Sequence, residues 1–387
     1  MNTIFTRCCA LLAIYSFVFA CKQRHAQSDI QNVGDQDDSN WESYTNEALD
    51  RGGPYNSYDV EPTTAEPLGS IAMEACRSGK TGCQLGFTEP TPSELISGVA
   101  APNQVSLFVM KSPKGIAWTS PRDLLNSTVS NSRGSPPHPI GHVMVELSCA
   151  DNGKGQPAYI LAGMSDVNAA QAYALLVAQA AGLDFLFHSF QGRLQTDSEI
   201  RADLFRYMNN ATEGPRLAQL THLISAETCQ RLVTYFDAYK EKGIYQHFGL
   251  SLRPLYQEGS GCSAFGVSFL QVAGLVQSDF DALWQTAVAV PYRFMKSGRI
   301  EEGRILRRAP VRRIEMFGGS WAESSENSRT LRFWNPDLIH QWITAAHRSE
   351  TYQALTHGGA GRVPIVVIDA TKTKTPTGSI FLSGVLQ

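Results

Sequence analysis

Neither acidic nor basic residues dominate this sequence of 387 residues, in which 33 Lys and Arg residues face 36 Asp and Glu residues for a formal net charge of −3. Electrostatics alone therefore gives no reason to expect a nucleic-acid partner. The 32 Gly and 19 Pro residues are too few for a fibrous or low-complexity protein. Because 43% of the residues are hydrophobic, the chain can bury one large core or two ordinary ones, and we expect a globular protein.

Several catalytic motifs are also missing. No Gly-x-Ser-x-Gly pattern supplies the nucleophile of an α/β serine hydrolase, and no Gly-x-x-x-x-Gly-Lys pattern supplies a phosphate loop. His138 and His142 have the spacing of two metal ligands on a helix, but Pro136, Pro137 and Pro139 oppose a helix there. We therefore expect no metal and no other cofactor, with His138 in a loop at the rim of a site.

Only the start of the chain has an uninterrupted apolar stretch. Residues 8–20 rise only about 20 Å as a helix, too little to cross a bilayer, so we interpret residues 1–20 as a cleaved signal peptide. The small Ala20 before Cys21 resembles the lipobox of bacterial lipoproteins, which implies a lipid on Cys21 that holds the protein at a bacterial membrane. The alternative is an ordinary secretory signal followed by a chance cysteine. No later segment is apolar enough to span a membrane.

The next segment is polar and acidic. Residues 22–67 contain ten Asp or Glu residues against three Lys or Arg residues. We expect residues 21–67 to form a flexible tether, with a loosely packed strap as the alternative, and residues 68–387 to form the globular domain. Together with the lipobox, this organisation predicts a lipid-anchored protein of the cell envelope, whose globular domain lies in the periplasm or outside the cell.

The globular part mixes strand and helix patterns, which predicts an α+β fold with an antiparallel sheet packed against helices. Residues 140–149 alternate as a strand with His142 and Glu146 on one face, and residues 158–162 return as the second strand of a hairpin. Ser225 is the expected N-cap of a helix that Gly243 ends. Further strands are expected over 105–110 and 363–369, and further helices over 167–181, from 262 to 276 and from 335 to 347.

A basic segment follows Pro291. Eight Lys or Arg residues fall within residues 293–313. A surface for anionic lipid or polymer is one interpretation, but we favour an ordinary solvated surface, because nearby Glu residues offset part of the charge.

The eight cysteines are expected to have different roles. Cys8 and Cys9 leave with the signal peptide and Cys21 carries the lipid, so an odd number remains. Cys76 and Cys83 are close enough in sequence to bridge a short loop. Cys149 and Cys229 either pair or remain buried thiols. Cys262 is the residue most plausibly left unpaired.

Cys262 begins a helix directly after Gly259, Ser260 and Gly261. A helix N-terminus lowers the pKa of a thiol and so favours the nucleophilic thiolate. Glycines on either side of Ser260 would let a substrate backbone approach, and the amide of Cys262 could bind an oxyanion. The alternative is a small buried cysteine at a capped helix start.

Two stretches, Gly141-His142-Val143-Met144-Val145-Glu146-Leu147 and Gly261-Cys262-Ser263-Ala264-Phe265, resemble circularly permuted papain-like hydrolases, which include relatives of NlpC-type peptidases and of lecithin retinol acyltransferase. In that family, a strand with the catalytic His precedes the helix that begins with the catalytic Cys. The resemblance implies a permuted papain-like core over about 140–276, with residues 277–387 as a C-terminal elaboration.

By this resemblance, Cys262 is the nucleophile and His142 the base. The family usually takes its third polar group from the neighbouring strand, where Tyr159 is the main candidate. Glu146 shares a strand face with His142, but four residues along a strand is about 13 Å. We keep Glu146 as a weak third candidate and the Cys-His dyad as the minimum.

The sequence therefore predicts a cell-envelope cysteine hydrolase or acyltransferase that acts on an amide or ester bond of a peptidoglycan peptide or a lipid. The alternative from a different class is a non-catalytic envelope lipoprotein that binds cell-wall polymer or a partner protein. The uncertain third residue and the unexplained C-terminal part favour this alternative.

Overall fold

The computed structural model describes residues 91–98, 101–132, 138–167, 182–208, 216–295, 314, 318–323, 326–349, 353–356 and 363–383. All of them belong to the compact unit from Gly86 to Gln387. The signal peptide, Cys21, the tether, and the pair Cys76 and Cys83 lie outside the described residues, as do nearly all of the helix expected over 167–181 and most of the basic segment.

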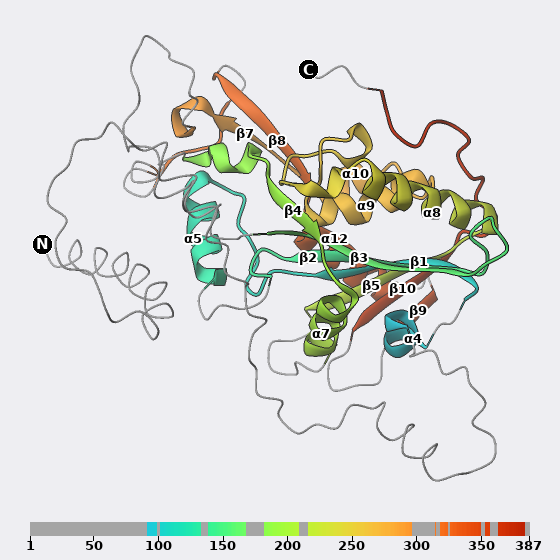
Figure 1. The fold of residues 1–387 in the computed structure, drawn as a ribbon. Helices are drawn as coiled ribbons and strands as arrows, with labels where there is room; N and C mark the ends of the chain where they lie inside the picture. Colours follow the sequence, from blue (N-terminus) through green and yellow to red (C-terminus); the bar gives the residue numbers. More distant parts are fainter. Residues whose placement is uncertain are drawn as a thin grey trace, which may run out of the picture. The chain divides into compact units, whose positions relative to one another are not determined.

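One mixed sheet organises the domain. Its eight strands are ordered β6-β4-β3-β2-β1-β5-β10-β9, and every neighbouring pair is antiparallel except β5 and β10, which are parallel. The strands are β1 (Asn103–Met110), β2 (His142–Cys149), β3 (Ala158–Asp166), β4 (Phe190–Leu194), β5 (Leu217–Leu223), β6 (His247–Phe248), β9 (Gln353–Thr356) and β10 (Pro364–Asp369). The sheet lies between helices on both of its faces (Figure 1).

The expected hairpin is present, because β2 pairs with β3 in antiparallel register. Side chains of β2 alternate between two hydrophobic clusters: Val143, Val145 and Leu147 lie in the larger one, and Met144 lies in the smaller one on the opposite face. Covered faces on both sides make nearly the whole strand buried. This explains why β2 carries apolar side chains on both of its faces.

Four helices cover the larger cluster: α8 (Ala226–Glu241), α9 (Cys262–Val272), α10 (Phe280–Trp284) and α12 (Pro336–Arg348). The Ser225 side chain accepts a hydrogen bond from the amide of Thr228, which confirms the expected N-cap of α8. Asn335 caps α12 in the same way. On α9, Phe265 and Phe269 are fully buried and pack against aromatic rings of α8, so these two helices share one apolar interface.

Two helices cover the opposite face: α4 (Pro92–Ser97) and α7 (Asp197–Met208). Ile96 of α4 packs with Ile200, Leu204 and Tyr207 of α7 over the smaller cluster. In Figure 1 these two helices lie across the sheet from α8 and α9. The site described below lies where β2 begins, between α7 and α9.

A third cluster brings α5 (Pro121–Ser132) together with a separate two-stranded sheet of β7 (Gln285–Pro291) and β8 (Ser328–Trp334). Short 3-10 helices occur at η2 (Leu183–Phe187), η3 (Ile244–Gln246), η4 (Pro254–Tyr256) and η5 (Tyr292–Phe294). Because β1, β9 and β10 belong to the main sheet, that sheet extends beyond residues 140–276 at both ends of the sequence. The expected α+β class is confirmed.

Cys149 and Cys229 form a disulfide that joins the end of β2 to the first turn of α8 across 80 residues of sequence. Of the two alternatives left open by the sequence, pairing is therefore the one observed. Among the described cysteines, only Cys262 has a free thiol.

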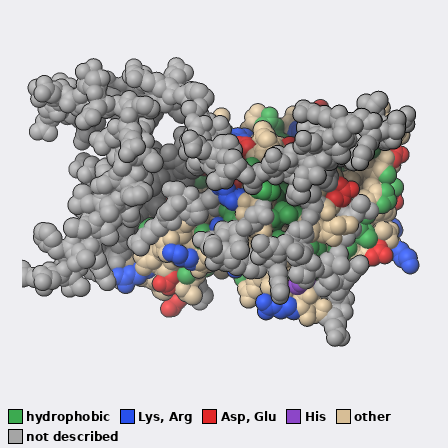
Figure 2. All heavy atoms as spheres, turned by 90° about the horizontal axis from the view of Figure 1, so that it is seen from below, with side chains coloured by type: hydrophobic (Ala, Val, Ile, Leu, Met, Phe, Trp, Pro, Cys, Tyr) green, Lys and Arg blue, Asp and Glu red, His purple; other side chains and the backbone are tan. Residues whose placement is uncertain are grey.

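Figure 2 shows the face of the molecule that carries α4 and α7, and acidic and basic side chains are scattered over its coloured part. This mixture agrees with the nearly balanced composition of the chain. Across the residues that the structure describes, no helix is both long enough and apolar enough to traverse a bilayer.

Candidate active site

Cys262 is the first residue of α9, and its thiol is half-buried. The N-cap is Gly261, which makes no side-chain hydrogen bond to the helix, so the first amides of α9 lack a side-chain cap. Gly266 lies against Val143, and a Cβ atom at residue 266 would meet that side chain. This close approach of helix and strand brings the start of α9 to the start of β2.

His142 is the first residue of β2, and it is buried beside Cys262. The two side chains lie close enough for each to shift the pKa of the other. Burial acts to lower the pKa of His142, but the charge and hydrogen bond of Cys262 outweigh it and raise that pKa overall. The structure therefore brings together the two residues that the sequence selected 120 positions apart.

The proximity that raises the pKa of His142 lowers the pKa of the Cys262 thiol. Burial disfavours the thiolate, but the charge of His142 and the hydrogen bond from its ring lower the pKa of Cys262 below its ordinary value. A hydrogen bond from the backbone of Val143 adds to this effect. A lowered thiol pKa beside a raised imidazole pKa is the electrostatic signature of a thiolate-imidazolium pair.

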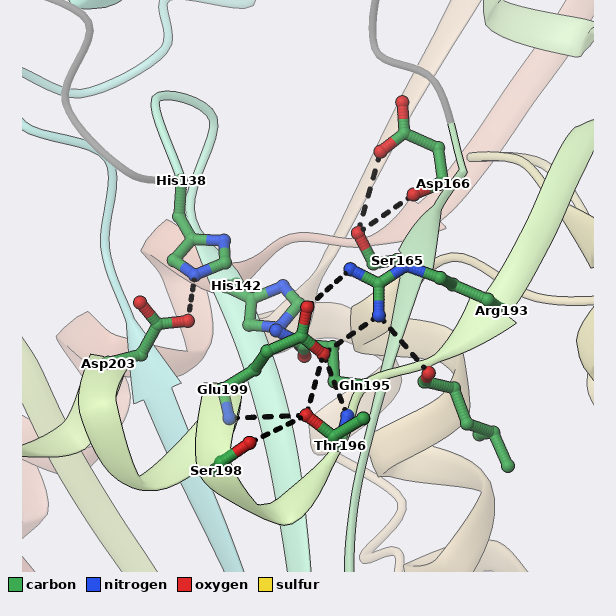
Figure 3. Close-up of polar contacts among 11 residues, drawn as sticks. His138, His142, Ser165, Asp166, Arg193, Gln195, Thr196, Ser198, Glu199 and Asp203 are labelled. Atoms are coloured by element: carbon green, nitrogen blue, oxygen red, sulfur yellow. Dashed lines mark hydrogen bonds and ion pairs between the residues drawn. The ribbon is translucent and has the colours of Figure 1, made fainter. Parts of the chain in front are cut away.

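Gln195 completes the site. Its Oε1 lies 2.6 Å from Nε2 of His142, and both side chains are buried (Figure 3). An amide oxygen only accepts, so Nε2 carries a proton and Nδ1 is the nitrogen left to exchange a proton with the thiol. Sequence reasoning missed Gln195, because it lies neither on β2 nor within the helix of the nucleophile.

Local structure holds Gln195 in place. Its backbone N–H donates to the carbonyl of Gly163 at 2.8 Å. Immediately after it, Thr196 and Glu199 form a capping box at the start of α7, and Arg193 binds the Glu199 carboxylate through both terminal nitrogens at 2.8 and 2.7 Å (Figure 3). The pKa of Glu199 falls to about 2, mainly because of the hydrogen bond from Arg193. This charged cluster fixes the backbone that presents Gln195.

A second histidine lies flat against the first. The rings of His138 and His142 have centroids 4.1 Å apart with an interplanar angle of 11°. Nε2 of His138 lies 2.8 Å from Oδ2 of Asp203 on α7 (Figure 3). Burial, and then the charge of His142, lower the pKa of His138 to about 4, so this ring is neutral at pH 7.

The Glu146 carboxylate makes its contacts elsewhere. It accepts hydrogen bonds from the amide of Ser93 and from the hydroxyl of Tyr159, each at 3.0 Å. Burial raises the pKa of Glu146, although these hydrogen bonds oppose the rise. Glu146 thus anchors the first turn of α4 to the sheet, and Tyr159 assists it. The expectation that Glu146 orients His142 is corrected: Gln195 occupies that position.

The loop before Cys262 packs against protein. The Ser260 amide donates to the carbonyl of His247 at 3.0 Å, and its buried hydroxyl lies 2.8 Å from that of Tyr239. At Gly259, whose φ is 113°, a Cβ atom would meet the backbone of His247, and at Gly261 it would approach Gly249. These glycines therefore allow two backbone segments to pack closely, which corrects the expectation that they make room for a substrate.

Within the described ranges, no group of three or more His, Cys, Asp or Glu side chains is arranged to hold a metal ion. His138 and His142 are stacked as described above, and His142 engages Gln195 and Cys262. The chemistry supported by these side chains is that of a thiol nucleophile with a histidine base.

No protein-family model matches the chain, and the searches of curated proteins and of solved structures return no match. The geometry of Cys262, His142 and Gln195 is therefore the basis on which a function can be assigned.

Proposed function

We propose that this protein is a cysteine hydrolase or acyltransferase that cleaves an amide or ester bond with Cys262 as nucleophile, His142 as general base and acid, and Gln195 as the group that orients His142. One observation carries the proposal: a free thiol and a neighbouring imidazole shift each other's pKa toward the ion pair, and a buried amide oxygen lies 2.6 Å from Nε2 of that imidazole. The amide oxygen fixes the plane of the His142 ring and keeps a proton on Nε2, which leaves Nδ1 to exchange a proton with the sulfur.

The reaction proceeds in two halves. The Cys262 thiolate attacks the carbonyl carbon, a C–S bond forms, and the carbonyl electron pair moves to oxygen. As the C–N or C–O bond breaks, His142 gives its Nδ1 proton to the departing amine or alcohol and a thioester remains. Water, or the hydroxyl or amine of an acceptor, then gives a proton to His142 and attacks the thioester, so that the acyl group leaves and the thiolate returns.

The start of α9 supplies stabilisation for the oxyanion. The amide of Cys262 lies at the N-terminus of an 11-residue helix whose first turn has no side-chain cap and no acidic residue. Both the free N–H groups and the helix dipole favour negative charge at this point. The amide and the nucleophile belong to the same residue, so a carbonyl attacked by the sulfur lies near that donor.

A papain-like relationship is part of the same proposal. A histidine at the start of a strand precedes a helix that begins with the nucleophile, in the order of the permuted papain-like hydrolases, and α9 packs on the sheet beside that strand. The third polar group, Gln195, comes from the loop after β4 rather than from the strand next to β2. The main sheet also uses strands outside residues 140–276.

We place the enzyme in the bacterial cell envelope, held by a lipid on Cys21. The disulfide between Cys149 and Cys229 supports export, because disulfides persist in oxidising compartments. In that location the accessible amide and ester substrates are peptidoglycan peptides and lipids, and these are the substrate classes that we propose to test.

The reactivity of Cys262 tests the enzyme directly. Alkylation of the non-reduced protein by iodoacetamide, followed across pH by mass spectrometry, should give a first rise at Cys262 well below pH 8.5. In His142→Ala the two effects that most strongly oppose burial, the charge and the hydrogen bond of the imidazole, are lost, so the rise should move to about pH 8.5 or above. A wild-type thiol that titrates at or above pH 8.5 would contradict the proposed function and favour a non-catalytic protein.

Gln195→Ala should lower kcat/KM by about 10-fold to 100-fold, because a hydrogen bond to a charged ring is worth about 1.5–3 kcal/mol. Hydrolysis of an activated nitrophenyl ester provides the measurement. Gln191→Ala removes the same amide from an exposed position on β4 and is the matched control. Equal effects of the two substitutions would show that Gln195 does not act on His142.

A further inference from the structure

The pair of His138 and Asp203 lies directly beside His142. His138 covers one face of the His142 ring in nearly parallel stacking, and its own Nε2 is bonded to Asp203. His138 and Asp203 are both largely shielded from solvent, with side-chain exposures of 18% and 17%. A histidine and a carboxylate in such a place require a physical explanation beyond general packing.

The backbone of His138 is held as firmly as its ring. Its φ of 50° lies in the left-handed region, which non-glycine residues occupy at a cost of about 1 kcal/mol or more. The carbonyl accepts hydrogen bonds from the amide of Gly141 at 3.1 Å and from Nη2 of Arg216 at 3.3 Å. Arg216 is itself buried and lies over the ring of Tyr207. These contacts maintain a conformation that the isolated segment would disfavour.

The neutral ring of His138 lies next to His142, and the carboxylate of Asp203 lies beyond His138. A neutral His138 donates its Nε2 hydrogen to Asp203 and imposes no positive charge on the ring beneath it. The negative charge of Asp203 lies behind His138 and favours the protonated form of His142. His138 therefore keeps water from one face of His142 while a carboxylate remains close enough to act electrostatically.

We propose that His138 and Asp203 are positioning residues for the reaction, in which Asp203 holds His138 flat against His142 and thereby fixes the imidazole plane and stabilises its protonated form. This inference rests on the proposed function, because it assumes that His142 serves Cys262. It adds a second histidine and a carboxylate to the machinery.

Several other groups act on His142 and must be considered with Asp203. Cys262 of α9 faces it directly, and Asp166 at the end of β3 interacts with it electrostatically. Arg216, the residue before β5, and Tyr207 of α7 lie close to His138. Among the residues that the structure describes, Asp203 is the carboxylate hydrogen-bonded to the stacked ring, so its substitution isolates the effect.

Iodoacetamide labelling of Cys262 in the full chain gives the test. Two steps are expected with rising pH: the lower reports formation of the thiolate, and the upper reports loss of the proton from His142. Asp203→Asn should move the upper step down by about 0.5 to 1 pH unit and leave the lower step in place, because an opposite charge near an imidazolium raises its pKa by about that amount or more. The thermal midpoint should remain close to that of the wild type.

Two further variants make the result decisive. Asp197→Asn removes the same charge from an exposed position on α7 and should leave both steps unchanged. Asp203→Ser likewise removes the carboxylate, so it should also lower the upper step, and it replaces Asp203→Asn as the test if that variant does not fold. An upper step that stays in place in the folded variant would overturn this inference alone, whereas a wild-type protein without a low first step would overturn the proposed function.

Discussion

Cys262→Ala should abolish turnover, with a loss of about 10⁴-fold or more in kcat, because no thioester can form without the sulfur. The substrates to test are purified peptidoglycan peptides, phospholipid vesicles and an activated nitrophenyl ester, with products followed by mass spectrometry. Cys262→Ser is the matched variant: it keeps the size and polarity of the side chain, but its hydroxyl is not ionised by His142. It should be nearly as inactive as the alanine variant.

The two variants also separate chemistry from folding. Cys262 is half-buried at a helix start and makes no disulfide, so both variants should unfold at nearly the same temperature as the wild type. Undiminished turnover by purified, folded Cys262→Ala would place the nucleophile elsewhere. Absence of turnover by the wild type on every substrate class, together with slow alkylation, would favour a binding protein that retains the fold without the reaction.

Removing the disulfide should lower the free energy of unfolding by about 4 kcal/mol. The bond closes a loop of 80 residues, and the entropy lost by the unfolded chain grows with the length of such a loop. Both cysteines are buried in the larger cluster, on β2 and α8, so the bond joins two central elements. Urea unfolding of the double variant Cys149→Ala, Cys229→Ala would measure the loss.

The control for this experiment is already at hand. Cys262→Ala removes a thiol from the start of α9 without removing a bond, so its urea midpoint should stay near that of the wild type. A reductant should lower the midpoint of the wild type and leave that of the double variant unchanged. A midpoint that does not respond to reduction would show that the bond contributes little to stability.

Local signals made part of this fold predictable from the sequence. Ser225 caps α8, Asn335 caps α12, and α9 begins at Cys262, because capping residues and helical periodicity act over a few neighbouring positions. The alternation of β2 similarly identified a strand. The order of helix and strand then sufficed to select Cys262 and His142, which the fold brings together.

The third group could not be found in this way. A capping-box pattern at Thr196 and Glu199 is visible in the sequence and would have predicted the start of α7, but nothing in it says which ring the preceding residue touches. That contact depends on the pairing of β4 with β3, which brings Gln195 to a histidine 53 residues earlier in the chain. Glu146 was selected because it shares a face with His142, whereas its partner, Ser93, is 53 residues earlier in the chain.

Gly163 on β3 imposes a further requirement on any chain that uses this chemistry. Its carbonyl accepts from the amide of Gln195, and a Cβ atom at residue 163 would occupy the space of the Gln195 side-chain oxygen. A flexible side chain can yield to a methyl group, so the domain would still fold, but the amide would leave His142. The residue at position 163 can therefore distinguish active relatives from inactive ones. We expect active relatives to keep a glycine there, on the strand next to that of the histidine. A larger residue at this position should mark an inactive relative even where the cysteine, histidine and glutamine are all retained.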